Sequence, residues 1–221
     1  MVKLGTVFKK STQEEKEKRS HDIISEALSR AKNPYTLFTG GKDSLVMLHL
    51  IQQLQDGKIP FPVLHIDTTV YFPEVYQYID KMRKLWGFSL VRERNEEALQ
   101  TISIAEDKKL CCRLLKTETL RKAIDKYEID YLFFAKSRDE AKEDPLLISK
   151  KNCELINPLH HFYENDTWNY IKENNLSYCS LYDRGFQKID CIPCAKKINN
   201  VKSVKSEDTT ILNKLKGLGY I

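Results

Sequence analysis

Short apolar segments alternate with longer amphipathic ones along this 221-residue chain, and this alternation constrains the fold more than any other feature. The short segments are typical of buried strands, and they lie at 35–38, 63–66, 89–91, 131–134 and 154–156. The longer segments carry apolar residues at helical spacing and lie at 43–55, 74–86, 114–127 and 166–173. Strands that alternate with helices predict a parallel sheet with helices on both faces, which binds ligands at the carboxyl ends of its strands.

The composition excludes several classes of protein and favours a soluble one. The net charge of +5 permits a polyanionic partner without demanding one. No apolar run reaches the roughly 18 residues of a membrane helix, and the first twenty residues lack the apolar core of a secretory signal. The segment 9–32 is rich in Lys and Glu and predicts an exposed N-terminal helix. We therefore expect a cytoplasmic protein whose cysteines stay reduced and that makes no contact with a membrane.

A hexapeptide between the first strand and the first long helix predicts a phosphate site: Thr39-Gly40-Gly41-Lys42-Asp43-Ser44. Its glycines let the backbone approach a ligand without a Cβ clash, and the helix that follows aims free N–H groups at phosphate oxygens. Lys42 adds a mobile positive charge, Asp43 can hold a Mg²⁺ ion that bridges phosphate oxygens, and Ser44 supplies a hydroxyl donor. The spacing is not that of a Walker A loop. An ordinary Gly-Gly turn is the alternative interpretation.

The six cysteines fall into two pairs and two single residues. Cys191-Ile192-Pro193-Cys194 is a C-x-x-C turn, which places two thiolates on one metal. The adjacent Cys111 and Cys112 cannot easily chelate one ion but can reach two irons of a cluster. Four thiolates suit either zinc or a [4Fe–4S] cluster, and buried apolar thiols are the alternative. Cys153 and Cys179 lie in no motif, and we expect core or lining thiols there.

The hexapeptide resembles the phosphate loop of N-type ATP pyrophosphatases, usually written S-G-G-K-D-S, with Thr39 in place of the first serine. Enzymes with this loop cleave ATP between the α and β phosphates, adenylate a substrate and release pyrophosphate. Further motifs over residues 30–198 resemble, in their order, the phosphoadenosine-phosphosulfate (PAPS) reductase family. They are His65-Ile66-Asp67-Thr68 with Phe72-Pro73-Glu74, Cys111-Cys112 with Lys116, Ser137-Arg138-Asp139-Glu140, Asn157-Pro158-Leu159 with Trp168, Leu181-Tyr182-Asp183-Arg184-Gly185-Phe186, and the C-x-x-C turn.

This resemblance implies a Rossmann-like, three-layer α/β fold of the adenine nucleotide alpha-hydrolase type with a Cys-rich C-terminal cluster-binding segment. It divides the chain into a charged helix over 1–32, a nucleotide-binding domain with an iron–sulfur site over 33–198, and a tail over 199–221. Family members with both cysteine pairs carry a [4Fe–4S] cluster. The resemblance therefore assigns four cluster ligands, which are Cys111, Cys112, Cys191 and Cys194.

The resemblance also implies roles at the nucleotide. The residues from Thr39 to Ser44 and Asp67 would bind ATP, with Asp43 on Mg²⁺. Lys116 and Arg138 would face the charged end of the nucleotide, and solvated surface charge is the alternative for both. The expected catalytic residues are Lys42, Asp43, Lys116 and Arg138.

Two departures from the reductases direct the functional prediction. The assimilatory reductases end in an E-C-G-[IL]-H motif whose cysteine attacks sulfur, and no cysteine follows Cys194 here. In those reductases the loop sequence typically departs from the motif around the Lys-Asp pair, whereas this chain keeps Lys42, Asp43 and Ser44. Both departures favour an ATP pyrophosphatase that activates an acceptor oxygen for replacement by sulfur.

In these features the chain looks most like the ATP pyrophosphatase of DNA phosphorothioation (the Dnd/Ssp type). That resemblance implies a cysteine desulfurase as sulfur donor and DNA, or tRNA in a thiolation enzyme, as acceptor. The alternatives are a reductase of adenylyl sulfate or PAPS and a non-catalytic, zinc-stabilised nucleotide-binding module. A homo-oligomer stays open.

Overall fold

The computed structural model describes residues 11–139 and 153–197 and contains one five-stranded sheet of order β3-β2-β1-β4-β5. All four pairings between neighbouring strands are parallel. The strands are β1 (Pro34–Leu37), β2 (Val63–Ile66), β3 (Leu90–Glu93), β4 (Tyr131–Phe133) and β5 (Glu154–Ile156). The predicted strands and their parallel arrangement are therefore confirmed. Expectations for residues 1–10, Glu140 and the tail from 198 fall outside the described residues.

The order of the strands creates one switch point, at β1. The chain runs outward from β1 to β2 and β3 on one side, and then returns to add β4 and β5 on the other side. Loops that leave neighbouring strands at such a point diverge and form a crevice at the carboxyl edge of the sheet. The hexapeptide begins two residues after β1 ends, so it lies at this crevice.

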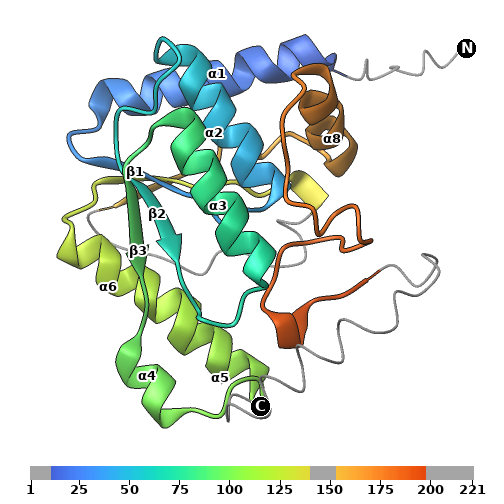
Figure 1. Cartoon of the computed structure of the whole chain (residues 1–221). Helices are drawn as coiled ribbons and strands as arrows, with labels where there is room; N and C mark the ends of the chain where they lie inside the picture. Colours follow the sequence, from blue (N-terminus) through green and yellow to red (C-terminus); the bar gives the residue numbers. More distant parts are fainter. Residues whose placement is uncertain (1–10, 140–152, 198–221) are drawn as a thin grey trace, which may run out of the picture.

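Helices cover both faces of the sheet, as Figure 1 shows. One face carries α1 (Gln13–Arg30), α2 (Lys42–Leu54), α3 (Pro73–Trp86) and α8 (Glu164–Glu173), and the other carries α6 (Thr119–Lys126). Each face has its own apolar core: Val63 and Phe133 pack in the larger one under α2 and α3, while Leu64 and Leu132 pack against α6. Successive strand residues thus point to opposite cores, which confirms the three-layer α/β fold.

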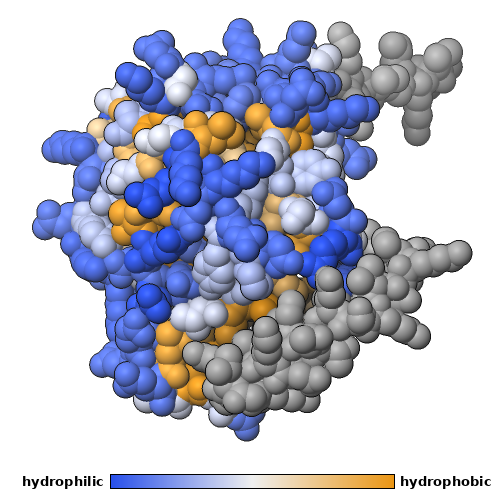
Figure 2. Space-filling view, viewed as in Figure 1, coloured by the Kyte–Doolittle hydropathy of each residue, from blue (hydrophilic) through white to orange (hydrophobic). Residues whose placement is uncertain are grey.

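Helix α1 is less exposed than we predicted. Thr12 is the N-cap of α1 and forms a capping box with Glu15. The Thr12 hydroxyl accepts a hydrogen bond from the Glu15 backbone amide, and the Glu15 carboxylate accepts one from the Thr12 backbone amide. Ile24 and Ala27 are buried on its inner side, as the weak stripe suggests. Ser20 is also buried, and its hydroxyl donates to the carbonyl of Pro158 at 2.8 Å. The charged outer side of α1 remains in solvent. Hydrophilic residues predominate along the top of the view in Figure 2, where α1 lies.

The helical segment that holds the first cysteine pair starts earlier than predicted. It begins with α5 (Lys108–Cys112), passes through a π-helical turn (Arg113–Glu118) and continues as α6. Asp107 caps its start by accepting hydrogen bonds from two backbone amides, and this cap is a local signal that the apolar pattern does not contain. A short helix, α4 (Glu96–Thr101), precedes it and was not predicted. Among the described helices none is long and apolar enough to cross a membrane.

Candidate functional site

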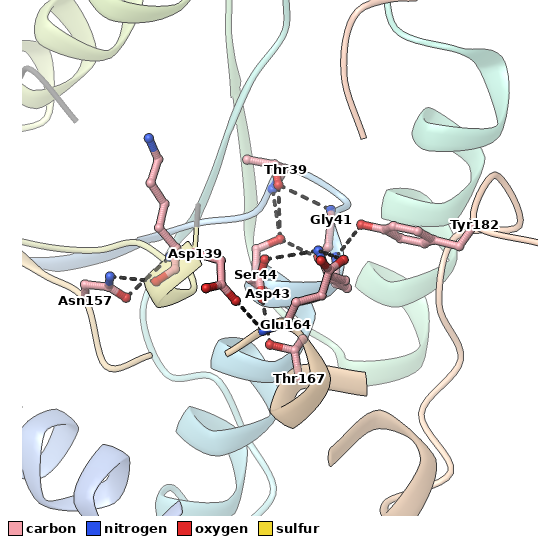
Figure 3. Close-up of polar contacts among 11 residues, drawn as sticks. Thr39, Gly41, Asp43, Ser44, Asp139, Asn157, Glu164, Thr167 and Tyr182 are labelled. Atoms are coloured by element: carbon pink, nitrogen blue, oxygen red, sulfur yellow. Dashed lines mark hydrogen bonds and ion pairs between the residues drawn. The ribbon is translucent and has the colours of Figure 1, made fainter. Parts of the chain in front are cut away.

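The hexapeptide forms a tight loop that braces itself. Gly40 has φ +78°, which favours glycine, and a Cβ there would lie 3.1 Å from Cγ1 of Val75 on α3, so a larger residue would also press on that side chain. The Thr39 hydroxyl accepts the Gly41 amide at 3.2 Å and lies 3.2 Å from the Ser44 hydroxyl. Ser44 donates in turn to the Gly41 carbonyl at 2.9 Å. These bonds aim the start of α2 into the crevice (Figure 3).

The two charged residues of the loop are buried and engaged with protein partners. Lys42 is 3% exposed and Asp43 is 6% exposed. The Lys42 ammonium lies 3.5 Å from Asp43 Oδ2 and 3.5 Å from Glu164 Oε1, and Asp43 Oδ1 accepts a hydrogen bond from Thr167 at 2.7 Å. The expectation that Lys42 carries a mobile charge is therefore wrong, because its buried ammonium lies between Asp43 and Glu164 of α8.

A distant tyrosine reaches the same loop. The Lys42 backbone N–H donates to the Tyr182 hydroxyl at 2.9 Å, and the Lys42 ammonium lies 5.9 Å from the centre of the Tyr182 ring. The ring itself stands edge-to-face against Trp168 of α8, with centroids 5.0 Å apart. Tyr182 belongs to a motif that the sequence singles out, but nothing local predicts its contact with a loop 140 positions earlier.

The loop after β4 positions the N-terminus of α8 beside the phosphate loop. The Glu164 amide donates to Asp139 Oδ2 at 3.3 Å, and the Arg138 amide donates to the Phe162 carbonyl at 2.7 Å. Arg138 itself is exposed and its guanidinium lies 5.5 Å from the centre of the Tyr163 ring. Asn157 ties the same loop down by accepting from and donating to the backbone of Lys136 (Figure 3). The predicted contact of Arg138 with a nucleotide stays a prediction.

A cavity of 140 Å³ opens beside the loop at the carboxyl ends of β1 and β2. Its lining is mostly apolar and comes from both strands and from the helical segment beyond: Leu37, Phe38, Thr39, Leu64, Ile66, Tyr71, Lys116, Thr117 and Leu120. An apolar cavity with one polar edge suits a planar, uncharged group such as a nucleobase. Asp67 lies just past the end of β2, where Oδ1 accepts from the Tyr76 hydroxyl and the Thr69 amide, both at 2.8 Å.

The four paired cysteines line one common cavity at the far side of Lys116. The backbone positions Cys191, because it forms an antiparallel bridge with Tyr71 and the next amide donates to the Val70 carbonyl at 2.9 Å. The Thr68 hydroxyl lies 3.1 Å from Cys191 Sγ. A 3-10 turn (Ile192–Cys194) then brings the second thiol round to the end of α5, where the other pair lies.

Lys116 separates the two cavities and contributes to the lining of both. Its ammonium lies 2.8 Å from Asp190 Oδ1, next to the first thiol of the C-x-x-C turn. Burial alone would lower the pKa of Lys116, but Tyr71, Cys191 and Asp190 beside it raise this pKa overall. Burial raises the pKa of Cys191 to about 11, and the positive charge of Lys116 opposes part of that rise. The free thiol is therefore protonated at neutral pH.

The cysteine cavity has the donor chemistry of a thiolate-bound cluster. Within the described residues, no three His, Cys, Asp or Glu side chains lie close enough to hold a metal ion. The four thiols nevertheless come from two segments and face one space, so the residues present fit a group that binds thiolates from both. Cys153 and Cys179 are buried in the apolar cores, as expected of core thiols.

Comparison with known proteins places these features in a family. The family model described as the phosphoadenosine phosphosulfate reductase domain matches residues 33–197. A sulfate adenylyltransferase subunit 2 from Methylorubrum extorquens (strain PA1) is 32% identical over 197 residues, which cover 75% of this chain and 64% of that relative. The subunit of the same name from Bacteroides fragilis (strain YCH46) is 32% identical over 206 residues, which cover 79% of this chain and 68% of the relative. The chain thus spans only about two thirds of these relatives.

Solved structures share the fold at low sequence identity. A PAPS reductase from Candida auris, in a phosphate complex, has a TM-score of 0.65 at 20% identity and covers 85% of this chain and 99% of its own. The U34-tRNA thiolase NcsA from Methanococcus maripaludis, with its [4Fe–4S] cluster, has a TM-score of 0.57 at 18% identity. The match covers 93% of this chain and 75% of the thiolase. An FMN adenylyltransferase from Candida glabrata, with FMN and an ATP analogue, has a TM-score of 0.64 at 16% identity. The match covers 91% of this chain and 73% of the adenylyltransferase.

Proposed function

The chain belongs to the phosphoadenosine phosphosulfate reductase domain family, and from this premise we propose that it is an ATP pyrophosphatase that adenylates an acceptor for the insertion of sulfur. The Lys42–Asp43 pair is intact and buried in a loop at the switch point of the sheet, and Lys116 lines both the adjoining cavity and the cavity of the four thiols.

The proposed reaction uses the loop to bind the phosphates of ATP. Backbone amides at the start of α2 and the Lys42 ammonium would hold phosphate oxygens, and Asp43 would hold Mg²⁺ between them. An acceptor oxygen attacks the α-phosphorus, the bond to the β-phosphate breaks, and pyrophosphate leaves with its charge balanced by Lys42 and the metal. The base would lie in the 140 Å³ cavity beside the loop.

The second half of the reaction takes place on the other side of Lys116. Sulfur at the sulfide level, supplied by a cysteine desulfurase together with a thiol reductant, would displace AMP from the acceptor. A [4Fe–4S] cluster held by Cys111, Cys112, Cys191 and Cys194 would supply a site that binds or relays sulfur. Lys116 lies at the boundary of both cavities, so its charge would act on the bound nucleotide and on the thiols alike.

The acceptor that we propose first is a DNA phosphate, as in DNA phosphorothioation. Adenylation converts a non-bridging phosphate oxygen into part of a good leaving group, which a weak nucleophile can then displace. A tRNA base carbonyl would be activated by the same chemistry, and the structural neighbour that thiolates tRNA has a [4Fe–4S] cluster. The net charge of +5 is compatible with either nucleic acid.

Sulfate is a second candidate acceptor, because the curated relatives at 32% identity are sulfate adenylyltransferase subunits. Sulfate would attack the same α-phosphorus and form adenylyl sulfate with release of pyrophosphate. This candidate requires only the loop and the nucleotide cavity, and it assigns no task to the four thiols. A partner subunit would complete the enzyme in this case.

A pyrophosphate-release assay on anaerobically purified protein tests the proposal. The protein is incubated with ATP and Mg²⁺ alone, with sulfate, and with DNA or tRNA plus a desulfurase and a thiol. Pyrophosphate that appears with nucleic acid, together with sulfur in the recovered acceptor, supports sulfur insertion, whereas adenylyl sulfate supports the second candidate. Absence of pyrophosphate under all conditions, with sulfite released from adenylyl sulfate and thioredoxin, would show a reductase instead.

A further inference from the structure

The start of α2 is capped by a side chain that comes from the other end of the domain. The N-terminal amides of a helix lack partners within the helix, and a side chain at the N-cap usually supplies one. The N-cap of α2 is Gly41, which has no side chain to offer. The Lys42 amide instead donates to the Tyr182 hydroxyl at 2.9 Å (Figure 3).

That amide is also a donor that an anion in the loop requires. Phosphate groups bind at helix N-termini because the free amides there point at them and the helix dipole is positive. The Tyr182 hydroxyl lies within 3.6 Å of the position that a Cβ on Gly41 would take, so it sits directly over the glycines of the loop. A phosphate oxygen and the tyrosine hydroxyl therefore cannot occupy the Lys42 amide together.

We propose that Tyr182 is an affinity-setting residue of the phosphate loop, whose hydroxyl occupies the place of a phosphate oxygen and is displaced when the anion binds. This inference rests on the proposed function, because it takes the loop to be the phosphate site. The exchange favours the anion, since a hydrogen bond to a charged oxygen is stronger than one to a neutral hydroxyl. Tyr182 thus keeps the loop ordered when it is empty, at the expense of affinity.

The aromatic neighbours of Tyr182 make its displacement observable by fluorescence. Its ring contacts Trp168 and Tyr178 edge-to-face, with centroids 5.0 and 6.2 Å away. Movement of the tyrosine changes the environment of Trp168, one of the two tryptophans in the chain. The other, Trp86, lies in α3 against His49, with ring centroids 5.9 Å apart, and does not share this contact.

The test compares the wild-type protein with Tyr182→Phe by calorimetric titration with Mg²⁺ and pyrophosphate. The phenylalanine keeps the ring contacts and removes the competing hydroxyl. We expect Y182F to bind pyrophosphate about threefold to tenfold more tightly, the size of one net hydrogen bond. It should also melt a few degrees lower, at about 2–5 °C below the wild type, because the helix loses its cap. A residue with a purely structural role would lower the melting temperature without tightening the binding.

Other outcomes separate this inference from the proposed function. Equal or weaker binding by Y182F would overturn the inference, since weaker binding makes the hydroxyl a ligand of the phosphate. Absence of binding by both proteins would overturn the phosphate site and the inference with it. Tryptophan fluorescence provides a second readout: saturation with pyrophosphate should change the wild-type spectrum, and Trp168→Phe should abolish the change. A wild-type spectrum that stays constant at saturation would also contradict displacement.

Discussion

The phosphate loop and the cysteine cavity both gather reactive groups from distant segments, but they hold them in different ways. In the loop the functional groups already have partners within the protein: Tyr182 on the Lys42 amide, carboxylates on its ammonium, and Thr167 on Asp43. At the cavity the backbone does the positioning, through the bridge from Cys191 to Tyr71 and the capped start of α5. A ligand must therefore displace protein groups at the loop, whereas at the cavity it would bind thiols that the backbone has already brought together, among them Cys191 beside the Thr68 hydroxyl.

The largest effect of a single substitution is expected at the cysteines. If a cluster joins the two segments, Cys191→Ser should remove essentially all iron and acid-labile sulfide from anaerobically purified protein. The protein should also lose stability, because the cluster cross-links α5 to the 3-10 turn. Iron and sulfide analysis with a thermal melt checks both. Cys153→Ser is the matched control, since Cys153 is as buried as Cys191, both being 8% exposed, and lies outside the cavity.

The result for iron discriminates between the remaining interpretations of the cysteines. Wild-type protein that contains zinc in place of iron and sulfide would contradict the cluster and support a zinc-stabilised module. Iron that survives in C191S and is lost in C153S would contradict the ligand assignment. Pyrophosphate release that persists in C191S would place the thiols in the sulfur step alone.

The loop should respond to a change of charge rather than of packing. Asp43→Asn keeps the size of the side chain and an oxygen that can accept from Thr167, but it removes the negative charge that would hold Mg²⁺. We expect kcat for pyrophosphate release to fall by at least about 100-fold. The melting temperature should also fall, because the buried Lys42 ammonium loses one of its two carboxylate partners. A variant with unchanged turnover would remove Asp43 from the metal site, and one that fails to fold would show that the Lys42–Asp43 pair is structural.

The sequence predicts the sheet, its longer helices and the two cysteine pairs well, because each rests on a local pattern, whereas the meeting of the two pairs in one cavity is implied only by the family resemblance. Strand alternation and the Gly-Gly junction locate the loop, and the pairs at Cys111 and Cys191 are recognisable by spacing. What the sequence misses are partners that depend on tertiary contact. Glu164, Thr167 and Tyr182 lie more than a hundred positions from Lys42, and polar residues at a helix start or in a turn carry no sign of what they will contact.

The same limit explains the wrong expectation for Lys42. A lysine beside two glycines at the start of a helix has the local pattern of an exposed, mobile charge. The burial of its side chain is imposed by α8, which comes from a different part of the chain and carries the Glu164 carboxylate to within 3.5 Å. The contact between Lys42 and Glu164 forms only when α8 packs beside α2 in the folded protein.

The shape of the loop can be tested apart from its chemistry with two glycines of equal backbone angle. Gly40 and Gly57 both have φ +78°, but an added Cβ would lie 3.1 Å from Val75 at Gly40 and would meet nothing within 4 Å at Gly57. We expect Gly57→Ala to lower the free energy of unfolding by about 1 kcal/mol through backbone strain alone. Gly40→Ala should lower it by about 2 kcal/mol or more. Equal losses in urea titrations would show that α3 does not constrain the loop.

The smallest expected effect concerns the second partner of the Lys42 ammonium. Glu164 is half exposed at the start of α8, so its attraction for Lys42 is screened by solvent, and removing its charge should change little in stability. A phosphate in the loop must nevertheless compete with this carboxylate for the ammonium. Glu164→Gln should therefore bind pyrophosphate about twofold to threefold more tightly, which corresponds to about 0.5 kcal/mol. Glu173→Gln, at an exposed position in the last turn of the same helix, is the charge-matched control and should leave the affinity unchanged. If both variants tighten binding equally, net charge alone sets the affinity and the contact at Lys42 is not specific. If Glu164→Gln weakens binding, Glu164 acts with Asp43 on the metal rather than against the phosphate.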